Sequence, residues 1–350
     1  MLKDFAVSTP ADATQAKALH LLRCQVDEWE GAARSGFLGG LCYGLQAVDA
    51  STGWAAVEAA LLSATPWRDV WQAAPSAVAS GRRGGLFWRH TGEWLFGMLR
   101  VDEPVGNNVN LEARARAAYD EVFSLLRQQG DWHLLRVWNY LPRINAEEGG
   151  LERYRQFNIG RQQAFQDHRR DNLAGSPAAC AIGTRGGPLC IYFLAGPHPS
   201  MPLENPRQVP AYHYPTEFGP RSPTFSRACL VRSAPGQCLL MISGTASIVG
   251  HDTVHAGDVQ AQAAETLRNL QAVIDQAHGR CTGRFALEEL ACTVYLRHAQ
   301  HAPAVMTVLG AAWGPQAKAL TQLVMVEADI CRADLLIEIE AHGVACGELL

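Results

Sequence analysis

The stretch that decides the fold is CLLMISGTASI at residues 238–248, followed by DVQAQAAETLRNLQAVIDQA at 258–277, LACTVYLR at 290–297 and LLIEIEA at 335–341. The first, third and fourth segments are short apolar runs, which are typical of buried strands. The second repeats apolar residues at helical spacing, at Ala261, Ala264, Leu267, Leu270, Val273 and Ile274. This order of strand, helix and strands predicts an α+β domain in which helices cover a mixed sheet.

The first half of the chain repeats the same pattern. GGLFWRH and EWLFGMLRV within residues 84–101 predict a hairpin that turns at Thr91–Gly92. Residues 110–130 predict a helix that ends at Gly130, and HLLRVWNYL at 133–141 predicts a buried strand. We therefore predict a duplicated, diverged domain, divided into residues 1–172 and 173–350.

A proline-rich connection runs from Pro197 to Pro223, within the predicted C-terminal half. It holds eight prolines, so it cannot be a regular element. Long irregular segments inside compact domains are often functional. This one carries Tyr212, Tyr214 and Arg221, with Arg227 just beyond, which indicates a binding role.

The composition excludes several classes of protein. A net charge of -4 gives no general attraction for nucleic acid or for a membrane surface. No stretch is long and apolar enough to span a membrane, and the opening residues lack the apolar run of a signal peptide, which favours a cytoplasmic location. Ten cysteines in mostly apolar surroundings predict reduced, buried thiols. Neither zinc-ligand spacing nor a nucleotide-binding glycine motif is present, so we predict no metal and no cofactor.

The C-terminal segment resembles the RidA (YjgF) family of small α+β domains. The residues that carry the resemblance are the SGT of 243–245, Gln262, Leu267 and Asn269 of the helix, Tyr295 and Arg297 of the next strand, and the IEIEA of 337–341. The resemblance implies a RidA-like, or chorismate-mutase-like, fold for this half. It also implies a degenerate RidA-like fold for the N-terminal half.

Other segments resemble the chorismatases. These are RVWNYLPRIN at 136–145, ERYRQFNIGRQQAF at 152–165 and AYHYPTEFGPRSPTFSRA at 211–228. The resemblance covers roughly residues 84–341 and implies an enzyme that splits the enolpyruvyl ether of chorismate into pyruvate and a ring acid.

Such a reaction needs a general acid that stays neutral until it is used. Glu338 lies between Ile337 and Ile339, and an apolar strand raises the pKa of a carboxyl group. Glu338 and Glu340 point to one face of a strand, and the pattern alone also allows both to face solvent at a sheet edge. The resemblance assigns the proton transfer to Glu338.

The two carboxylates of chorismate need cationic partners, and the planar guanidinium binds a carboxylate in a bidentate manner. We predict Arg161, Arg221 and Arg297 for this role, with Tyr154 and Tyr214 as hydroxyl donors. A surface salt bridge is the alternative for each arginine. Arg153, Arg155, Arg169 and Arg170 are interpreted as a solvated helix face.

Cys331, taken alone, is a small buried hydrophobic residue. By resemblance, chorismatases that form 3-hydroxybenzoate carry a cysteine here and a glycine at the position of Gly244. Glycine leaves room for the ring, and a thiol can steer attack by a ring hydroxyl in place of water. The pair predicts an aromatic product, 3-hydroxybenzoate with or without 4-hydroxybenzoate.

Two other functions stay open. A RidA-like imine deaminase needs an arginine that the family carries in a P-x-R context before its last strand, and this sequence has no counterpart. A non-catalytic regulator would bind a small acid in the same cleft and release no pyruvate. The pattern also leaves the oligomer open, because RidA domains form trimers with sites between subunits and a two-half chain could act as a monomer.

Overall fold

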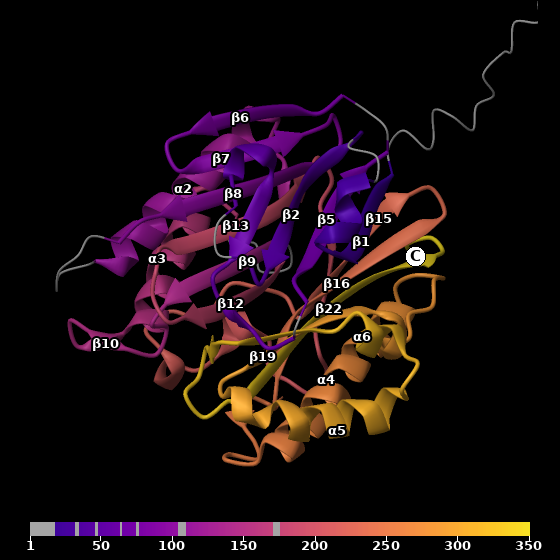
Figure 1. The fold of residues 1–350 in the computed structure, drawn as a ribbon. Helices are drawn as coiled ribbons and strands as arrows, with labels where there is room; N and C mark the ends of the chain where they lie inside the picture. Colours follow the sequence, from indigo (N-terminus) through magenta and orange to yellow (C-terminus); the bar gives the residue numbers. More distant parts are fainter. Residues whose placement is uncertain are drawn as a thin grey trace, which may run out of the picture.

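Three larger β-sheets organise the protein in the computed structural model (Figure 1), which describes residues 18–350 apart from 32–34, 46–47, 64, 75–76, 104–109 and 171–175. The predicted boundary between residues 172 and 173 lies outside the described residues. Among the described residues, no helix is both long and apolar enough to cross a membrane.

The first seven-stranded sheet is built mainly by the N-terminal half and has the order β21-β12-β9-β13-β8-β7-β6. Its helices are α2 (Leu111–Gln128) and α3 (Arg153–Asp167). Its strands are β6 (Ala79–Arg83), β7 (Leu86–His90), β8 (Leu95–Val101), β9 (His133–Pro142), β12 (Ala178–Thr184), β13 (Leu189–Gly196) and β21 (Asp329–Ile330).

The second seven-stranded sheet has the order β14-β15-β16-β22-β19-β20-β4. Its helices are α4 (Val259–His278), α5 (Ala302–Trp313) and the short α6 (Lys318–Thr321). Its strands are β4 (Ala60–Leu61), β14 (Met201–Leu203), β15 (Ala228–Ala234), β16 (Gln237–Ala246), β19 (Ala291–Leu296), β20 (Val324–Glu327) and β22 (Ile337–Cys346).

The two sheets share one strand order. Read from β12 to β6, the first sheet matches the second read from β20 to β14. The match includes strand direction, since β9 pairs with β12 and β19 with β20 in parallel, whereas β9 with β13 and β19 with β22 are antiparallel. The mixed α+β class is therefore confirmed. The last two strands of the first sheet, β12 and β13, lie beyond residue 172.

A four-stranded sheet that the sequence did not predict fills the N-terminal part. Its order is β1-β5-β2-β3, with β1 (Leu19–Gln25), β2 (Phe37–Tyr43), β3 (Trp54–Val57) and β5 (Trp67–Ala73). A cluster of buried apolar residues joins it to both larger sheets, for example Trp71 of β5, Trp138 of β9 and Met241 of β16. Separate apolar clusters lie beneath α2 and α3 and beneath α4 and α5. The helices thus cover the outer faces, and the inner faces of the sheets share one core (Figure 1).

Polar groups cross this shared core in matched pairs. Arg23 of β1 binds Asp69 of β5 through Nε and Nη2, at 2.6 and 2.7 Å, and also reaches Thr293 Oγ1 of β19 at 2.8 Å. Arg136 of β9 pairs with Glu340 of β22. The first pair lies within the N-terminal sheet, where Arg23 and Asp69 are register partners, and Arg23 reaches the second larger sheet through Thr293; the second pair joins the two larger sheets. Because a buried ion left without its partner is costly, these contacts fix how the sheets meet.

Two sequence interpretations need correction. The buried face of α4 includes the polar residues Gln262, Glu265 and Asn269, while Ala261, Ala264 and Leu267 are only partly covered. These polar residues are buried because they fasten neighbouring loops. Arg153 was interpreted as solvated, yet it is buried at the start of α3, where it binds Glu103, Glu148 and the carbonyl of Pro142.

Candidate active site

A cavity of about 650 Å³ opens where the two larger sheets meet. A small inner chamber of about 40 Å³ adjoins it and shares several of its walls. Residues from α3, the end of β16 and the segment before β22 line both spaces, and the proline-rich connection lines the larger one. Of the predicted site residues, these spaces bring together Glu338, Cys331, Gly244, Tyr154, Tyr214 and Arg161.

An irregularity in the pairing of β16 with β22 creates the space for the Glu338 carboxyl. The register shifts between Ile242 and Thr245, so Ser243 and Gly244 form a bulge. A Cβ atom on Gly244 would lie 1.8 Å from Oε1 of Glu338 and 3.2 Å from Cβ of Cys180. Glycine is therefore required here to let the carboxyl occupy its present position. The sequence argument assigned this room to the substrate ring, whereas in the structure the acid itself fills it.

Glu338 is a buried carboxyl without a cationic partner. Its side chain is 4% exposed, and no described residue pairs with it or hydrogen-bonds to it. Burial, followed by the neighbouring Glu340, raises the pKa of Glu338 to about 8. The group is thus largely protonated at neutral pH, as a general acid must be before it acts. The alternative of a solvent-facing strand edge is wrong for both glutamates, since Glu340 is also buried.

Three arginines around the two spaces have N–H groups without a hydrogen-bond partner among the described residues. These groups are Nε and Nη2 of Arg161, Nε of Arg227 and Nη2 of Arg332. Arg161 is 3% exposed and lies 5.2 Å from the ring centres of both Tyr119 and Phe165. An unpaired buried N–H of a cation is costly, so the site is arranged to receive an anion.

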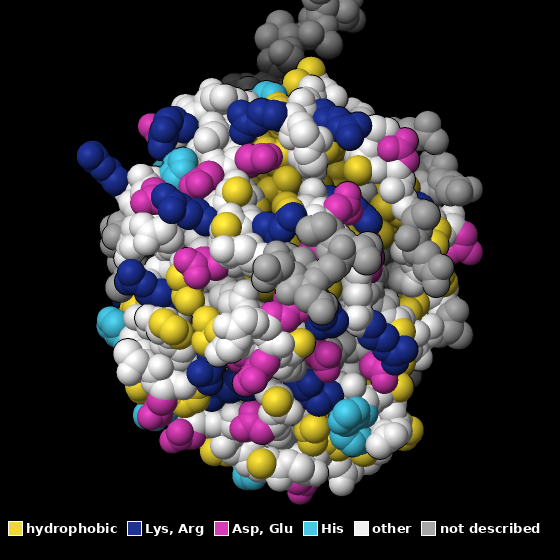
Figure 2. Space-filling view, turned by 90° about the vertical axis from the view of Figure 1, so that its left-hand side faces the viewer, with side chains coloured by type: hydrophobic (Ala, Val, Ile, Leu, Met, Phe, Trp, Pro, Cys, Tyr) yellow, Lys and Arg dark blue, Asp and Glu magenta, His cyan; other side chains and the backbone are white. Residues whose placement is uncertain are grey.

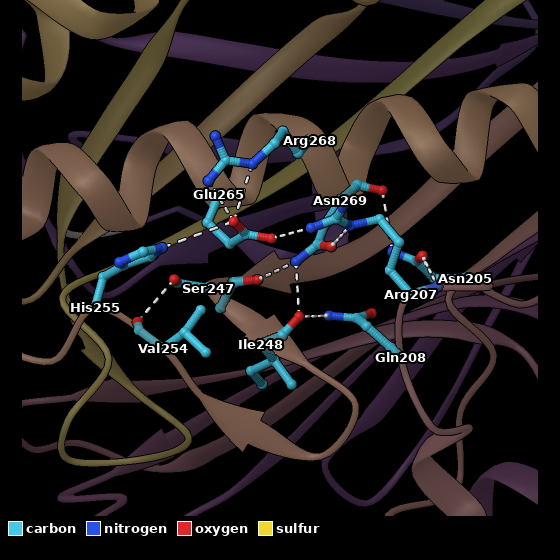
Figure 3. A network of polar contacts seen from close by, with 11 residues as sticks. Asn205, Arg207, Gln208, Ser247, Ile248, Val254, His255, Glu265, Arg268 and Asn269 are labelled. Atoms are coloured by element: carbon cyan, nitrogen blue, oxygen red, sulfur yellow. Dashed lines mark hydrogen bonds and ion pairs between the residues drawn. The ribbon is translucent and has the colours of Figure 1, made fainter.

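A polar network holds the walls of the cavity in place (Figure 3). Arg207 of the proline-rich connection binds both Glu265 and Asn269 of α4. The side-chain amide of Asn269 donates to the carbonyls of Ala246 and Ile248, at 3.0 and 2.9 Å, just beyond the Gly244 bulge. Gln262 bonds to the backbone of Asp334 and Leu336 on the other side. The polar face of α4 therefore fixes both segments that flank Glu338.

A second cavity, of about 980 Å³, lacks the features of a site for this chemistry. It lies between the N-terminal sheet and β7, β8 and β13, with apolar walls such as Trp54, Phe87 and Leu99. Its cation Arg100 already pairs with Glu58 at 2.6 Å. The smaller cavity is therefore the candidate active site.

One face of the protein surface carries positive and negative side chains side by side, without an extended patch of either sign (Figure 2).

Comparison with known proteins points to one family. The N-terminal family of FkbO/Hyg5-like chorismatases matches residues 69–195. A 3-hydroxybenzoate synthase of Streptomyces hygroscopicus is 38% identical over 289 residues, which is 79% of this chain and 82% of that protein. The chain belongs to the chorismatase family. A chorismatase of the same organism is 37% identical over 78% of each chain.

A crystal structure of a chorismatase has the same fold. It superimposes with a TM-score of 0.82 at 32% identity, and covers 93% of this chain and 98% of its own. This agreement extends over all three sheets, including the N-terminal sheet that the sequence patterns did not reveal.

Two predicted arginines lie away from the chorismatase cavity. Arg221 is exposed and is not among the residues that line it. Arg297, at the end of β19, donates to Asp329 at 2.7 Å and to the carbonyls of Ile330 and Leu335. Arg297 therefore fastens the segment that carries Cys331, and its guanidinium is already satisfied. The structure gives no support for a carboxylate-binding role of either residue.

Two further arginines line the cavity: the sequence analysis noted Arg227 beside the proline-rich connection without assigning it to a carboxylate, and it missed Arg332. Arg332 follows Cys331 directly, and its guanidinium lies 4.1 Å from the ring centre of Phe218. Arg227 donates from Nη2 to the Tyr214 hydroxyl at 2.8 Å and to the carbonyl of Val209. A signal was present for both, since Arg227 closes the proline-rich connection and Arg332 adjoins the cysteine already singled out.

Cys331 faces the cavity as a neutral thiol. Burial, and then the nearby Glu338, raises the pKa of Cys331 to about 12. A thiol with such a pKa can donate a weak hydrogen bond, but it is a poor nucleophile. Its place beside Glu338 and Gly244 suits it to steer a reacting group, without forming a covalent bond.

We expect the unpaired acid to cost stability in a manner that depends on pH. In the unfolded chain the carboxyl titrates near 4.5, against about 8 when folded. The folded state therefore loses stability as pH rises through this window, and the loss is complete above it. Glu338→Gln has no such loss, so its advantage in unfolding free energy over the parent should grow by on the order of 4–5 kcal/mol between pH 4 and pH 9.

Urea unfolding of both proteins across this pH range measures the difference. Glu288→Gln, which changes an exposed glutamate, serves as the matched control. A constant difference between the Glu338→Gln protein and the parent would contradict the raised pKa.

Proposed function

We propose that this protein converts chorismate to 3-hydroxybenzoate and pyruvate. The observation that carries the proposal is a neutral, buried carboxyl, Glu338, in a cavity that also holds unpaired arginine N–H groups. Membership of the chorismatase family and the likeness to a 3-hydroxybenzoate synthase support the choice of substrate and product. The two products together contain all the atoms of chorismate, so the reaction needs no added water.

The proton of Glu338 starts the reaction. Transfer of this proton to the terminal methylene carbon of the enolpyruvyl group creates an oxocarbenium centre. The ether bond to the ring then breaks, its electron pair stays on the oxygen, and pyruvate leaves. The hydroxyl on the neighbouring ring carbon, with its hydrogen, bonds to the carbon that lost the ether as its bond to its original carbon breaks, so the positive charge passes to that original carbon. The carbon that now bears the hydroxyl loses its ring proton to the Glu338 carboxylate, which makes the ring aromatic and restores the acid.

Arginines hold the two carboxylates of the substrate. Arg161, Arg227 and Arg332 line the two spaces, and each has an N–H group without a hydrogen-bond partner among the described residues; Tyr154 and Tyr214 add hydroxyl groups. Fixed donors at both ends of the substrate would keep the methylene carbon against Glu338, which lowers the entropic part of the barrier. Arg297 acts indirectly in this proposal, because it fixes the segment of Cys331 and Arg332.

Cys331 and Gly244 set the product. The neutral thiol lies beside the acid and can direct the ring hydroxyl, and the glycine lets the carboxyl lie close to the bulge. This arrangement favours internal attack over attack by water. The proposal includes release of 4-hydroxybenzoate beside 3-hydroxybenzoate, and chromatography of the ring product measures both acids.

One chain is enough to build this site. We propose that the chain consists of two RidA-like halves that divide between β13 and β14. The first set of matching strands ends with β13 and the second begins with β14, and the match to the N-terminal family ends at residue 195. The cavity takes walls from both halves. A second subunit is therefore not needed, and we propose a monomer. Its ten free cysteines suit a reducing compartment such as the cytoplasm.

Purified, EDTA-treated protein should release pyruvate from chorismate together with 3-hydroxybenzoate. Glu338→Gln should lower kcat by about 10²–10⁴-fold with little change in chorismate affinity, since it removes positioned acid catalysis but keeps the size of the side chain. A coupled pyruvate assay and chromatography of the ring product measure both. Pyruvate formation at the parental rate in the variant would reject Glu338 as the acid. Absence of pyruvate from the parent would favour an imine deaminase or a binding protein.

A matched pair of substitutions tests the anion-binding set. Arg161→Met should lower kcat/KM by roughly 10- to 100-fold, because it removes a charge-assisted hydrogen bond to a substrate carboxylate. Arg221→Met should leave kcat/KM near the parental value, since Arg221 is exposed away from the cavity. Steady-state kinetics with chorismate gives both values. The reverse order of effects would contradict the role of Arg161 and support the one predicted from the sequence for Arg221.

A further inference from the structure

A buried polar cluster lies behind the active site on one face of β22. Alternate residues of this strand, Glu338, Glu340 and His342, all point into the core between the sheets, and each is at most 6% exposed. Three titratable groups on one buried face are unusual, because each charge there must be paired or neutralised. Their pairing therefore decides which of them carries a proton.

Glu340 is a fully paired anion. One oxygen, Oε2, accepts from Nη2 of Arg136, and the other, Oε1, accepts from the Tyr295 hydroxyl at 2.9 Å. The Tyr140 hydroxyl lies 3.2 Å from that of Tyr295 and extends the chain. Arg136 also donates to the carbonyl of Ile242, next to the Gly244 bulge. Both oxygens of Glu340 are thus fixed from β9 and β19.

The remaining charges of this core are balanced without Glu338. Asp69 is matched by Arg23, and burial lowers the pKa of His342 to about 3, which leaves that ring neutral. Burial also raises the pKa values of Tyr43, Tyr140 and Tyr295, so their hydroxyls stay protonated. Two arginines therefore match two carboxylates, and Glu338 is the third carboxyl.

We propose that Glu340 is a positioning residue for the reaction at Glu338: its fixed negative charge, held by Arg136 and Tyr295, makes Glu338 the carboxyl of this cluster that carries the proton. The inference rests on the proposed function and deepens it, because it assigns the control of the acid to a residue outside the cavity. Glu340 is not among the residues that line the cavity.

The geometry supports an electrostatic effect of this kind. Side chains two residues apart on a strand start about 7 Å from one another, and a like charge at such a distance in a poorly solvated region disfavours a second anion. Other charged or titratable groups line the two spaces with Glu338. Cys180, Tyr154, Arg161 and Cys331 line the inner chamber, and the wider cavity adds Glu147, Glu152, Arg155, Tyr214, Arg227, Asp252, Arg332 and Asp334. No carboxylate among them contributes to the raised pKa of Glu338, whereas Glu340 does.

None of these groups replaces Glu340 in this role. Cys180 and Cys331 are neutral thiols whose pKa values are raised by burial. Arg227 favours the charged form of Glu338, as does Arg136. Glu340 is thus the fixed negative charge on this face that opposes ionisation of Glu338, and bound substrate carboxylates at the arginines would add to its effect.

The test removes the charge of Glu340 and then removes that of Arg136 as well. Glu340→Gln keeps the size of the side chain but leaves Arg136 as an unmatched cation near Glu338. The midpoint of Glu338 titration should then fall by about one to three pH units. In the double variant Glu340→Gln/Arg136→Met no net charge remains at this place, and the midpoint should return most of the way to the parental value.

Infrared spectroscopy of the carboxyl carbonyl band, recorded from pH 5 to pH 10 without substrate, reports the midpoint directly. Glu338→Gln identifies the band, and Glu327→Gln, which changes a glutamate paired with the exposed Arg185, is the control. The pH profile of kcat should shift in the same direction as the band. An unchanged midpoint in folded Glu340→Gln protein would overturn the proposal.

Two outcomes separate this inference from the proposed function and from a folding defect. The infrared midpoint needs no chorismate, so it can shift as expected even if no pyruvate is formed. If Glu340→Gln does not fold, the infrared titration of the parent protein is still informative. One buried carboxyl band that titrates above neutral pH and disappears in Glu338→Gln supports the pairing of two arginines with Asp69 and Glu340, which leaves Glu338 as the protonated carboxyl. Two such bands, or none, would contradict it.

Discussion

The antiparallel pairing of β16 with β22, interrupted at Gly244, is the constraint on which the rest of the structure depends. The bulge leaves a space that the carboxyl of Glu338 fills, and a single Cβ atom there would meet it at 1.8 Å. The same pairing places Glu338 and Glu340 on one face of β22, with Glu338 at the cavity and Glu340 one step further along the strand, beside Arg136. Because the bulge is also bonded to the first sheet, through Ser243 Oγ to the backbone of Ala179, the acid lies at the seam between the two halves.

Both halves contribute groups to this seam. The second half supplies the neutral acid together with Tyr214, Arg227 and Arg332, and α3 of the first half supplies Arg161 and Tyr154. These groups are held from outside the cavity: Arg297 fixes the segment of Cys331, and the network of Glu265, Asn269 and Arg207 fixes the connection (Figure 3). Before substrate binds, the site is rigid and some of its polar groups have no hydrogen-bond partner. Such a site lowers the stability of the protein but favours catalysis, because its side chains need little reorganisation during the reaction.

Sequence patterns and resemblance predicted the α+β class and singled out six of the residues that line the two spaces. Glu338, Gly244 and Cys331 lie together there, as strand alternation and motif positions, which are local properties, led us to expect; their roles stay predictions. They failed where the outcome depends on contacts distant in sequence. Arg297 ends an apolar strand as expected, but a neighbouring loop supplies its partners. Arg153 looked solvated because Glu103, which binds it, is fifty positions away. The N-terminal sheet has mixed patterns in short strands, and only its packing on the shared core makes it regular.

The central claim is that Glu338 protonates the enolpyruvyl methylene of chorismate in the cavity at the seam. A crystal structure of the Glu338→Gln protein with chorismate tests it most directly, because the substrate should bind without reacting. The account predicts the methylene carbon about 3–3.5 Å from the amide of residue 338, with the two carboxylates on Arg161, Arg227 or Arg332. Chorismate bound in the larger cavity beside Trp54 and Phe87, or with its methylene turned away from residue 338, would contradict the account.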